Sequence, residues 1–189
     1  MFLLRLRFVE AIMRRLLFQA LVRPTLTEPL GQGDEAELAE LGSHLNQATR
    51  ARLGRSLSIR VLDAGSCNGC ELEINALSNP FYDLERFGLR VVASPRHADV
   101  LLVTGPVTKN MCDALKMAYE AMPHPKWVVA TGDCSVDGGC FAGSYAVVGA
   151  VSQIIPVDLT IRGCPPSPSA ILRGLVSLMS LPINPDMPK

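Results

Sequence analysis

The 189-residue sequence lacks a net charge, a disulfide-rich framework and any long uninterrupted apolar run. Its 18 basic residues are balanced by 18 acidic ones, so no global positive field favours nucleic acid as a partner. Six cysteines are too few and too unevenly placed for a secreted disulfide scaffold of this length, which favours reduced thiols in the cytoplasm. Apolar residues still make up 48%, enough for a hydrophobic core, and this excludes disorder throughout.

The first 23 residues combine apolar side chains with a local excess of arginine. Five arginines stand against the single Glu10, and they interrupt every apolar run before it reaches the roughly 18 residues that span a bilayer. We predict a basic amphipathic helix on a membrane surface or against a membrane-bound partner; a helix that packs on its own domain is the alternative. We assign residues 1–55 to this N-terminal amphipathic, helical arm and residues 56–189 to the main domain.

From Ser56 onward, apolar β-branched runs alternate with segments of helical character. The runs at 100–104 and 127–131 are continuously apolar, which is typical of buried parallel strands. The alternation predicts an α/β fold with a mostly parallel sheet. We predict strands at 57–62, 89–93, 100–104, 127–131 and 157–161, helices at 71–77, 110–122 and 167–179, and one or two short helices at 34–53, interrupted by Gly42.

Four of the cysteines stand in turns rich in glycine or proline, in the pattern C-x2-C-x63-C-x29-C. Cys67 and Cys70 follow the first predicted strand, Cys134 follows the strand at 127–131, and Cys164 follows the last strand. Sites in open α/β sheets form beyond the carboxyl ends of the strands, so three loops should converge on one edge of the sheet. The topology therefore predicts a single site that contains these four cysteines.

Thiolates gathered from several strand ends are what a [4Fe–4S] cluster requires, because each of its four irons takes one sulfur ligand. Zinc is one alternative, although it usually prefers two paired C-x2-C motifs. Unrelated buried cysteines are another. Cys112 falls inside a predicted helix and is most simply a small buried residue, whereas Cys140 is expected to form a wall of the site rather than to bind.

Four stretches in the same order carry a family resemblance: GSCNGCELE, FYDLERFGLRVVASPRHADVLLVTGPVTKNM, MPHPKWVVATGDCSVDGG and IPVDLTIRGCPPSPSAIL. Over residues 57–180 the chain resembles the small subunit of group 4 membrane-bound, energy-converting [NiFe] hydrogenases of the formate hydrogenlyase and hydrogenase-4 type. The same stretches are similar to the 20-kilodalton subunit of respiratory complex I. The resemblance implies a flavodoxin-like fold with helices on both faces of the sheet. It also implies one [4Fe–4S] cluster, with Cys67, Cys70, Cys134 and Cys164 as its ligands.

The resemblance further implies partners and a place in the cell. A hydrogenase-like large subunit would contain the reaction site, a ferredoxin-like iron–sulfur subunit would deliver electrons, and membrane-arm subunits would move ions. The chain would lie peripherally on the cytoplasmic side of the cell membrane. It would be the electron-transfer subunit of an oxidoreductase complex and would not be active alone.

Two local features refine this expectation. The spaced pair Cys67 and Cys70 resembles the hydrogenase branch, because the complex I subunit has adjacent cysteines at this place. Glu73 matches an acidic residue that the resemblance links to proton coupling, since a carboxylate near a cluster that gains negative charge holds its proton more tightly. Capping or pairing at the subunit surface is the alternative role of Glu73, and Glu71 is a weaker candidate for the coupling.

Two alternatives to the hydrogenase function stay open at this point. The first is the equivalent subunit of a nickel-free relative that reduces a quinone or a sulfur compound. The second is a structural zinc-binding assembly subunit without a redox role.

Overall fold

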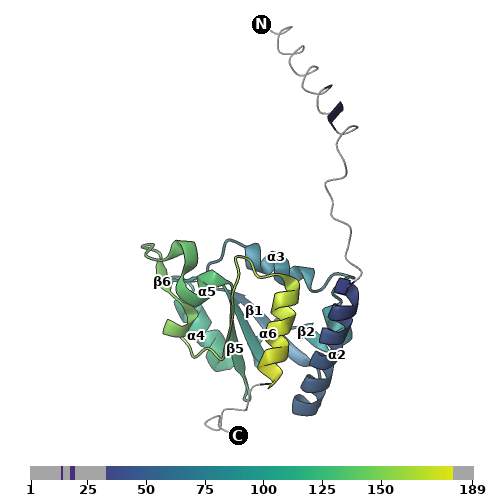
Figure 1. Cartoon of the computed structure of the whole chain (residues 1–189). Helices are drawn as coiled ribbons and strands as arrows, with labels where there is room; N and C mark the ends of the chain where they lie inside the picture. Colours follow the sequence, from purple (N-terminus) through teal and green to yellow (C-terminus); the bar gives the residue numbers. More distant parts are fainter. Residues whose placement is uncertain (1–13, 15–17, 20–32, 181–189) are drawn as a thin grey trace. The chain divides into compact units, whose positions relative to one another are not determined.

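The computed structural model describes residues 14, 18–19 and 33–180 (Figure 1). The predicted amphipathic helix at 1–23 therefore lies almost entirely outside the described residues. By internal contacts the chain divides into Met1–Asp34 and Glu35–Lys189, whereas the sequence alone places the boundary at residue 55. Among the described helices, none combines the length and the apolar character needed to cross a membrane.

A five-stranded parallel sheet forms the centre of the described domain (Figure 1). Its strand order, β2-β1-β3-β5-β7, is that of the flavodoxin-like doubly wound fold, in which the chain first moves to one side of β1 and then to the other. The predicted α/β class is thus confirmed. The strands are β1 (Leu57–Asp63), β2 (Leu89–Val91), β3 (Val100–Thr104), β5 (Trp127–Thr131) and β7 (Leu159–Ile161).

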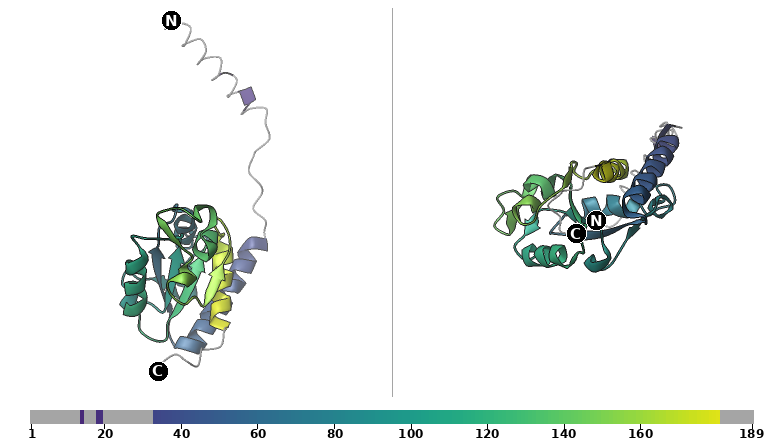
Figure 2. Two further views of the ribbon diagram at one scale, coloured as in Figure 1. Left: turned by 90° about the vertical axis from the view of Figure 1, so that its left-hand side faces the viewer. Right: turned by 90° about the horizontal axis from the view of Figure 1, so that it is seen from below.

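Alternate side chains of the strands supply two separate hydrophobic layers. In β3, Val100 and Leu102 belong to the layer beneath α2, α3 and α6, whereas Leu101 and Val103 belong to the layer beneath α4. Figure 2 shows these helices on opposite sides of the sheet. Burial on both faces explains why β3 and β5 are apolar throughout. The helices are α2 (Gly33–Leu53), α3 (Gly69–Ala76), α4 (Cys112–Ala121) and α6 (Pro168–Ser180).

Helix α2 is one continuous helix of 21 residues, not the interrupted pair expected from Gly42. Gly42 is buried where the helix meets the ring of Phe87, so its lack of a side chain permits close packing. Leu45 is fully buried in the core beneath the helix. Arg52 donates hydrogen bonds to the carbonyls of the last turn of α6 and lies 4.8 Å from the centre of the Trp127 ring.

Several short elements were not predicted. A two-stranded antiparallel pair, β4 (Val107–Thr108) and β6 (Val147–Gly149), lies apart from the main sheet. Helix α5 (Asp133–Asp137) follows β5 directly and carries one of the four cysteines. The remaining short turns are the 3-10 helices η1 (Leu84–Phe87), η2 (Pro95–His97), η3 (Gly139–Phe141) and η4 (Val151–Gln153).

Candidate metal centre

The four cysteines predicted to converge do line one cavity of about 110 Å³. Its walls come from the segments that follow β1, β3, β5 and β7, so it lies at the carboxyl edge of the parallel sheet, as the topology predicts. We call it the four-cysteine cavity; it is lined by Ser66, Cys67, Gly69, Cys70, Gly105, Asp133, Cys134, Gly163, Cys164 and Pro165.

The segment between β1 and α3 is held by a series of side-chain to backbone hydrogen bonds. Asp63 Oδ1 accepts from the amides of Gly65 at 2.7 Å and Ser66 at 2.6 Å. Ser66 Oγ in turn accepts from the Asn68 amide at 3.0 Å. Asn68 adopts a left-handed conformation with φ of 70° and begins α3, which places Cys70 in the first turn of that helix.

The two distant segments that carry the other cysteines are tied directly to each other. The Asp133 amide donates to the Gly163 carbonyl at 2.9 Å, and the Gly163 amide donates to Asp133 Oδ1 at 3.1 Å. Arg162 pairs with Asp137 at 2.6 Å. These bonds fix the position of Cys134 relative to Cys164, although 29 residues separate the two in the sequence.

Two glycines permit the close approach of these segments. Gly132 has φ of 91°, and a Cβ atom there would lie 2.5 Å from the Cys70 sulfur. Gly105 has φ of 72°, and a Cβ atom there would lie 2.5 Å from the Ser66 amide nitrogen. Both positions therefore require glycine for two reasons, the positive φ and the contact.

The electrostatics of the cavity disfavour thiolates when no cation is present. Burial raises the pKa of Cys70 to about 12, with further contributions from the charge of Glu71 and from the other three cysteines. Burial also raises the pKa of Cys134, with Cys140 and Cys164 as the next causes. Mutual repulsion of this kind requires that the thiols lie close together. A group with positive charge would be needed to hold all four as thiolates.

Not every cysteine takes part in this site. All six lie within the described residues and are free thiols. Cys112, at the start of α4, is half-buried and does not line the cavity. Cys140 also stays outside the lining, although after burial it is the next cause of the raised pKa of Cys134.

The two glutamates of α3 occupy different environments. Glu71 accepts a hydrogen bond from Thr104 Oγ1, and its other carboxylate oxygen is buried without a hydrogen-bond partner among the described residues. Its charge acts on Cys70. Glu73 is half-buried two residues further along the helix. Of the two, the structure thus brings Glu71 into the surroundings of the cavity, although the sequence ranked Glu73 first.

Among the described residues, no group of three or more histidine, cysteine, aspartate or glutamate side chains is arranged so that it could hold a metal ion directly. The four thiols are instead distributed around the four-cysteine cavity. That arrangement suits a cluster, in which each sulfur binds a different iron.

Comparison with known proteins gives consistent results. The sequence profile described as "NADH ubiquinone oxidoreductase, 20 Kd subunit" matches residues 67–178. The probable membrane-bound hydrogenase subunit mbhJ of Pyrococcus furiosus is 50% identical over 124 residues, which cover 66% of this chain and 74% of that protein. Formate hydrogenlyase subunit 7 of Escherichia coli is 45% identical over 130 residues, 69% of this chain but only 51% of that protein.

A solved structure is also similar. A chain of the membrane-bound sulfane sulfur reductase, described as an archaeal respiratory membrane complex, superposes with a TM-score of 0.60 at 38% sequence identity. The match covers 71% of this chain and 72% of that one. Both the sequence and the fold of the described domain are therefore shared with these proteins.

Proposed function

This chain belongs to the family of the 20 Kd subunit of NADH ubiquinone oxidoreductase, whose members are subunits of oxidoreductase complexes, and we propose that it transfers electrons through one [4Fe–4S] cluster. The cluster would lie in the four-cysteine cavity, bound by Cys67, Cys70, Cys134 and Cys164. The observation that carries the proposal is that these four thiols, from three separate loops, line one cavity at the carboxyl edge of the sheet.

When bound, the cluster supplies one-electron redox chemistry, and the chain's own residues bind, orient and shield it. The cysteines would supply four thiolates, and because the pKa values of Cys70 and Cys134 are raised, loading releases protons from these two. Backbone amides beside the cavity would donate hydrogen bonds to the ligand sulfurs. Such amide-to-sulfur bonds help to set the reduction potential.

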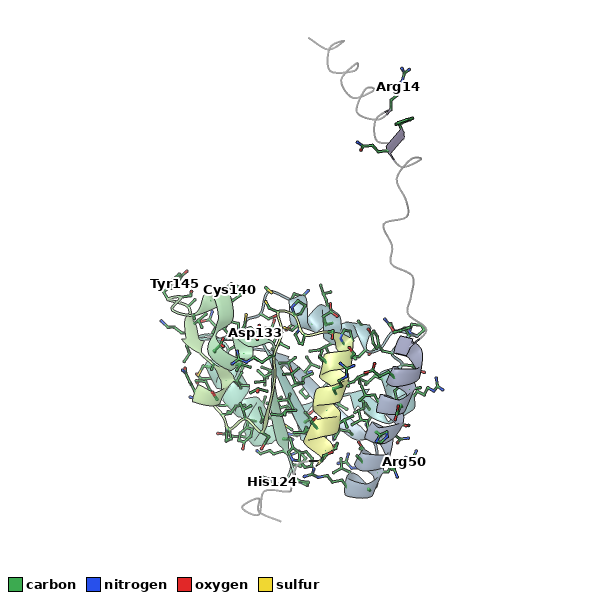
Figure 3. All side chains as sticks on the ribbon, in the orientation of Figure 1. Arg14, Arg50, His124, Asp133, Cys140 and Tyr145 are labelled. Carbon is green, nitrogen blue, oxygen red and sulfur yellow. The ribbon has the colours of Figure 1, made fainter. Side chains whose placement is uncertain are left out.

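The surface near the cavity supports a role as one subunit among several. Cys67 and Cys164 are exposed, so the cavity is open to a neighbouring protein. Large apolar side chains are also exposed close by in the sequence: Leu72 after Cys70, and Phe141 and Tyr145 after Cys140. Tyr145 is 90% exposed, and Figure 3 shows it at the same end of the molecule as Cys140. We propose that these side chains form part of the interface with a neighbouring subunit.

We assign the partners from this exposed surface and from the complexes to which the similar proteins belong. The large subunit that contains the reaction site would cover the cavity, a ferredoxin-like iron–sulfur subunit would deliver electrons, and membrane-arm subunits would anchor the assembly and move ions. The chain would then be peripheral, on the cytoplasmic side of the membrane. The basic segment at 1–23 would contribute to docking there.

Two reaction types are candidates for the activity of the complex as a whole. The similarity to hydrogenase subunits and the spaced pair Cys67 and Cys70 favour a [NiFe] hydrogenase. The similarity to a chain of a sulfane sulfur reductase favours a nickel-free relative instead. Metal analysis of the purified complex separates the two, since an intact complex without nickel excludes the hydrogenase.

The cluster itself is tested on the full chain. Anaerobic protein should contain about four irons and four sulfides per chain and absorb broadly near ~400 nm. Protein that binds zinc in preference to iron, or that stays colourless after reconstitution with ferrous iron and sulfide, would exclude the electron-transfer function.

A further inference from the structure

We propose that a neighbouring subunit adds a short extended segment, which carries an acidic side chain, to the free edge of β1 at residues 60–63. A groove of about 450 Å³ lies against this edge. We call it the β1 groove; it is lined by Arg60, Val61, Leu62, Asp63, Pro95, Met111, Ala114, Met117 and Ala118. The inference goes beyond the proposed function, because no residue lines both this groove and the four-cysteine cavity.

Strand β1 extends further than its neighbour β2. On the side of β3, the pairing of β1 continues as far as Asp63. On the side of β2, the register ends where Ile59 lies opposite Val91. Residues 60–63 therefore have a neighbouring strand on one side only, and all four of them line the β1 groove.

The backbone of Val61 faces the free side of this edge. The Leu57 amide donates to the Gly88 carbonyl, and the Ile59 carbonyl accepts from the Val92 amide. Every second residue of β1 thus directs its backbone groups towards β2. By the same alternation, the amide and the carbonyl of Val61 point beyond the end of β2, where an added strand would pair with them.

A short connection between β2 and β3 leaves a groove over the carboxyl half of β1. The connection has only eight residues, 92–99, whereas a parallel crossover usually has a dozen or more and forms a helix. It crosses β1 near the start of the strand, since the Asp99 amide donates to the Ser58 carbonyl at 2.8 Å. Its residue Ala98 packs in the layer beneath α4, so the crossing lies on that face of the sheet.

Helix α4 supplies the apolar wall of the β1 groove. Met111, Ala114 and Ala118 recur at spacings of three and four residues, so they share one face of the helix. Met117 also lines the groove and is 64% exposed. The alanines allow a chain to approach closely, and methionine side chains adapt to the shape of an apolar partner. Alternate side chains of an added strand would be buried against this wall.

Arg60 determines the charge that the added segment must carry. Its side chain lies on the α4 face, because Ile59 belongs to the opposite layer and Leu62 to this one. Arg60 is half-buried, and within the described part of the chain no hydrogen bond or ion pair involves its side chain. Asp63 instead accepts from two backbone amides. A half-buried guanidinium of this kind favours a carboxylate on the added segment.

The terminal segments of this chain meet these requirements less well. Residues 1–23 carry five arginines against the single Glu10, so their charge would repel Arg60. Residues 181–189 follow α6, which packs on the face of the sheet opposite to α4. An extended segment of another subunit, with alternating apolar residues and an aspartate or glutamate, fits the β1 groove better than either.

Hydrogen exchange tests the pairing of the added strand. The purified complex is compared with the isolated full chain at matched iron content, and exchange over residues 60–63 is read by mass spectrometry. We expect exchange to be about 10-fold slower in the complex, because a paired amide exchanges only when its hydrogen bond opens. Residues 101–103 of β3 are paired on both sides already and should exchange equally in the two samples.

Photo-crosslinking identifies what occupies the groove. The substitution Met117→benzoylphenylalanine places a photoreactive group in the full chain within the complex. Lys116→benzoylphenylalanine is the control, since Lys116 is exposed on α4 but does not line the groove. Position 117 should link to a segment of another subunit that contains aspartate or glutamate. Adding R60Q should lower the yield of this product, whereas R60K keeps the charge and should preserve it.

The outcomes decide the proposal independently of the cluster, because neither readout requires iron. A product within this chain or with a second copy of it overturns the proposal, as does the absence of a product at position 117. A product without slower exchange over residues 60–63 also overturns it, because the occupant then does not pair as a strand. If circular dichroism shows that R60Q folds and its yield is unchanged, the acidic partner of Arg60 is refuted.

Discussion

Substitution of Gly132 by alanine should expel the cluster while leaving the fold intact. Gly132 has φ of 91° and ψ of 150°, a region occupied essentially by glycine alone, so an alanine there costs about 1–3 kcal/mol from the backbone alone. The new Cβ atom would also stand 2.5 Å from the Cys70 sulfur. Unbonded atoms of this kind are stable at about 3.5–4.0 Å, so the sulfur would have to move by roughly 1 Å.

A displacement of this size should prevent iron binding, because metal–ligand distances vary by only about 0.2 Å. Gly143 provides the matched control: its φ is 79°, but a Cβ atom there meets nothing within 4 Å. We expect G132A and G143A each to lower the free energy of unfolding of the metal-free chain by about 1–3 kcal/mol. Only G132A should lose iron.

The assay combines iron per chain after anaerobic reconstitution with denaturant unfolding of the metal-free proteins. Full iron content in G132A would refute the argument, because it would show that the Cys70 sulfur does not need its observed position. Equal loss of iron in G143A would refute it as well, since backbone strain rather than contact would then be the cause.

Four further predictions follow from particular contacts. L45A should lower the free energy of unfolding by about 2–5 kcal/mol in thermal or urea denaturation, because Leu45 is fully buried between α2 and the core. An unchanged free energy of unfolding would mean that the helix does not pack as described. D133A should destabilise the chain by about 1 kcal/mol and lower iron retention, because the Gly163 amide loses its acceptor, whereas D133N keeps an acceptor oxygen and should behave like the unaltered chain. The unfolding midpoint of the metal-free chain should fall as the pH rises from 9 towards 12. Cys70 ionises near its ordinary pKa of 9.0 in the unfolded chain, whereas its pKa in the folded chain is about 12, so rising pH favours unfolding. The variant C70S should weaken this dependence. If Glu73 couples protons to electrons, redox titration should show a cluster potential that falls by about 59 mV per pH unit in the unaltered chain and much less in E73Q; an effect of E71Q alone would assign the coupling to Glu71.

The sequence predicted the elements whose residues are buried on both sides. The bounds of β3 and β5 match the predicted runs 100–104 and 127–131, because continuous apolar β-branched segments have no other stable placement. Helix α6 begins at Pro168, one residue after the start of the helix predicted at 167–179, and the Ser167 hydroxyl caps it by accepting from the Ala170 amide at 3.3 Å. The convergence of the four cysteines followed from their positions just after the carboxyl ends of the predicted parallel strands.

What the sequence could not predict depends on contacts between distant residues. Gly42 predicts an interruption of the helix, because the sequence does not show that the Phe87 ring packs against this position. Strands β4 and β6 contain only two and three residues, too few for any periodic pattern. The close approach of Gly139 to Cys134 depends on positive φ at two successive glycines, Gly138 and Gly139, which glycine permits but does not require.

The origin of the cavity in widely separated loops constrains the order of assembly. Cys67 and Cys164 come together only after β7 has joined β5 at the far edge of the sheet. A nascent chain therefore has no complete site until the segment carrying Cys164 has been made, and delivery of iron and sulfide to the proposed cluster site would follow folding. Once bound, the cluster would act as a cross-link between the first and last strands. Its loss should release the β7 edge before the rest of the sheet, a local opening that hydrogen exchange of the Leu159–Ile161 amides would detect.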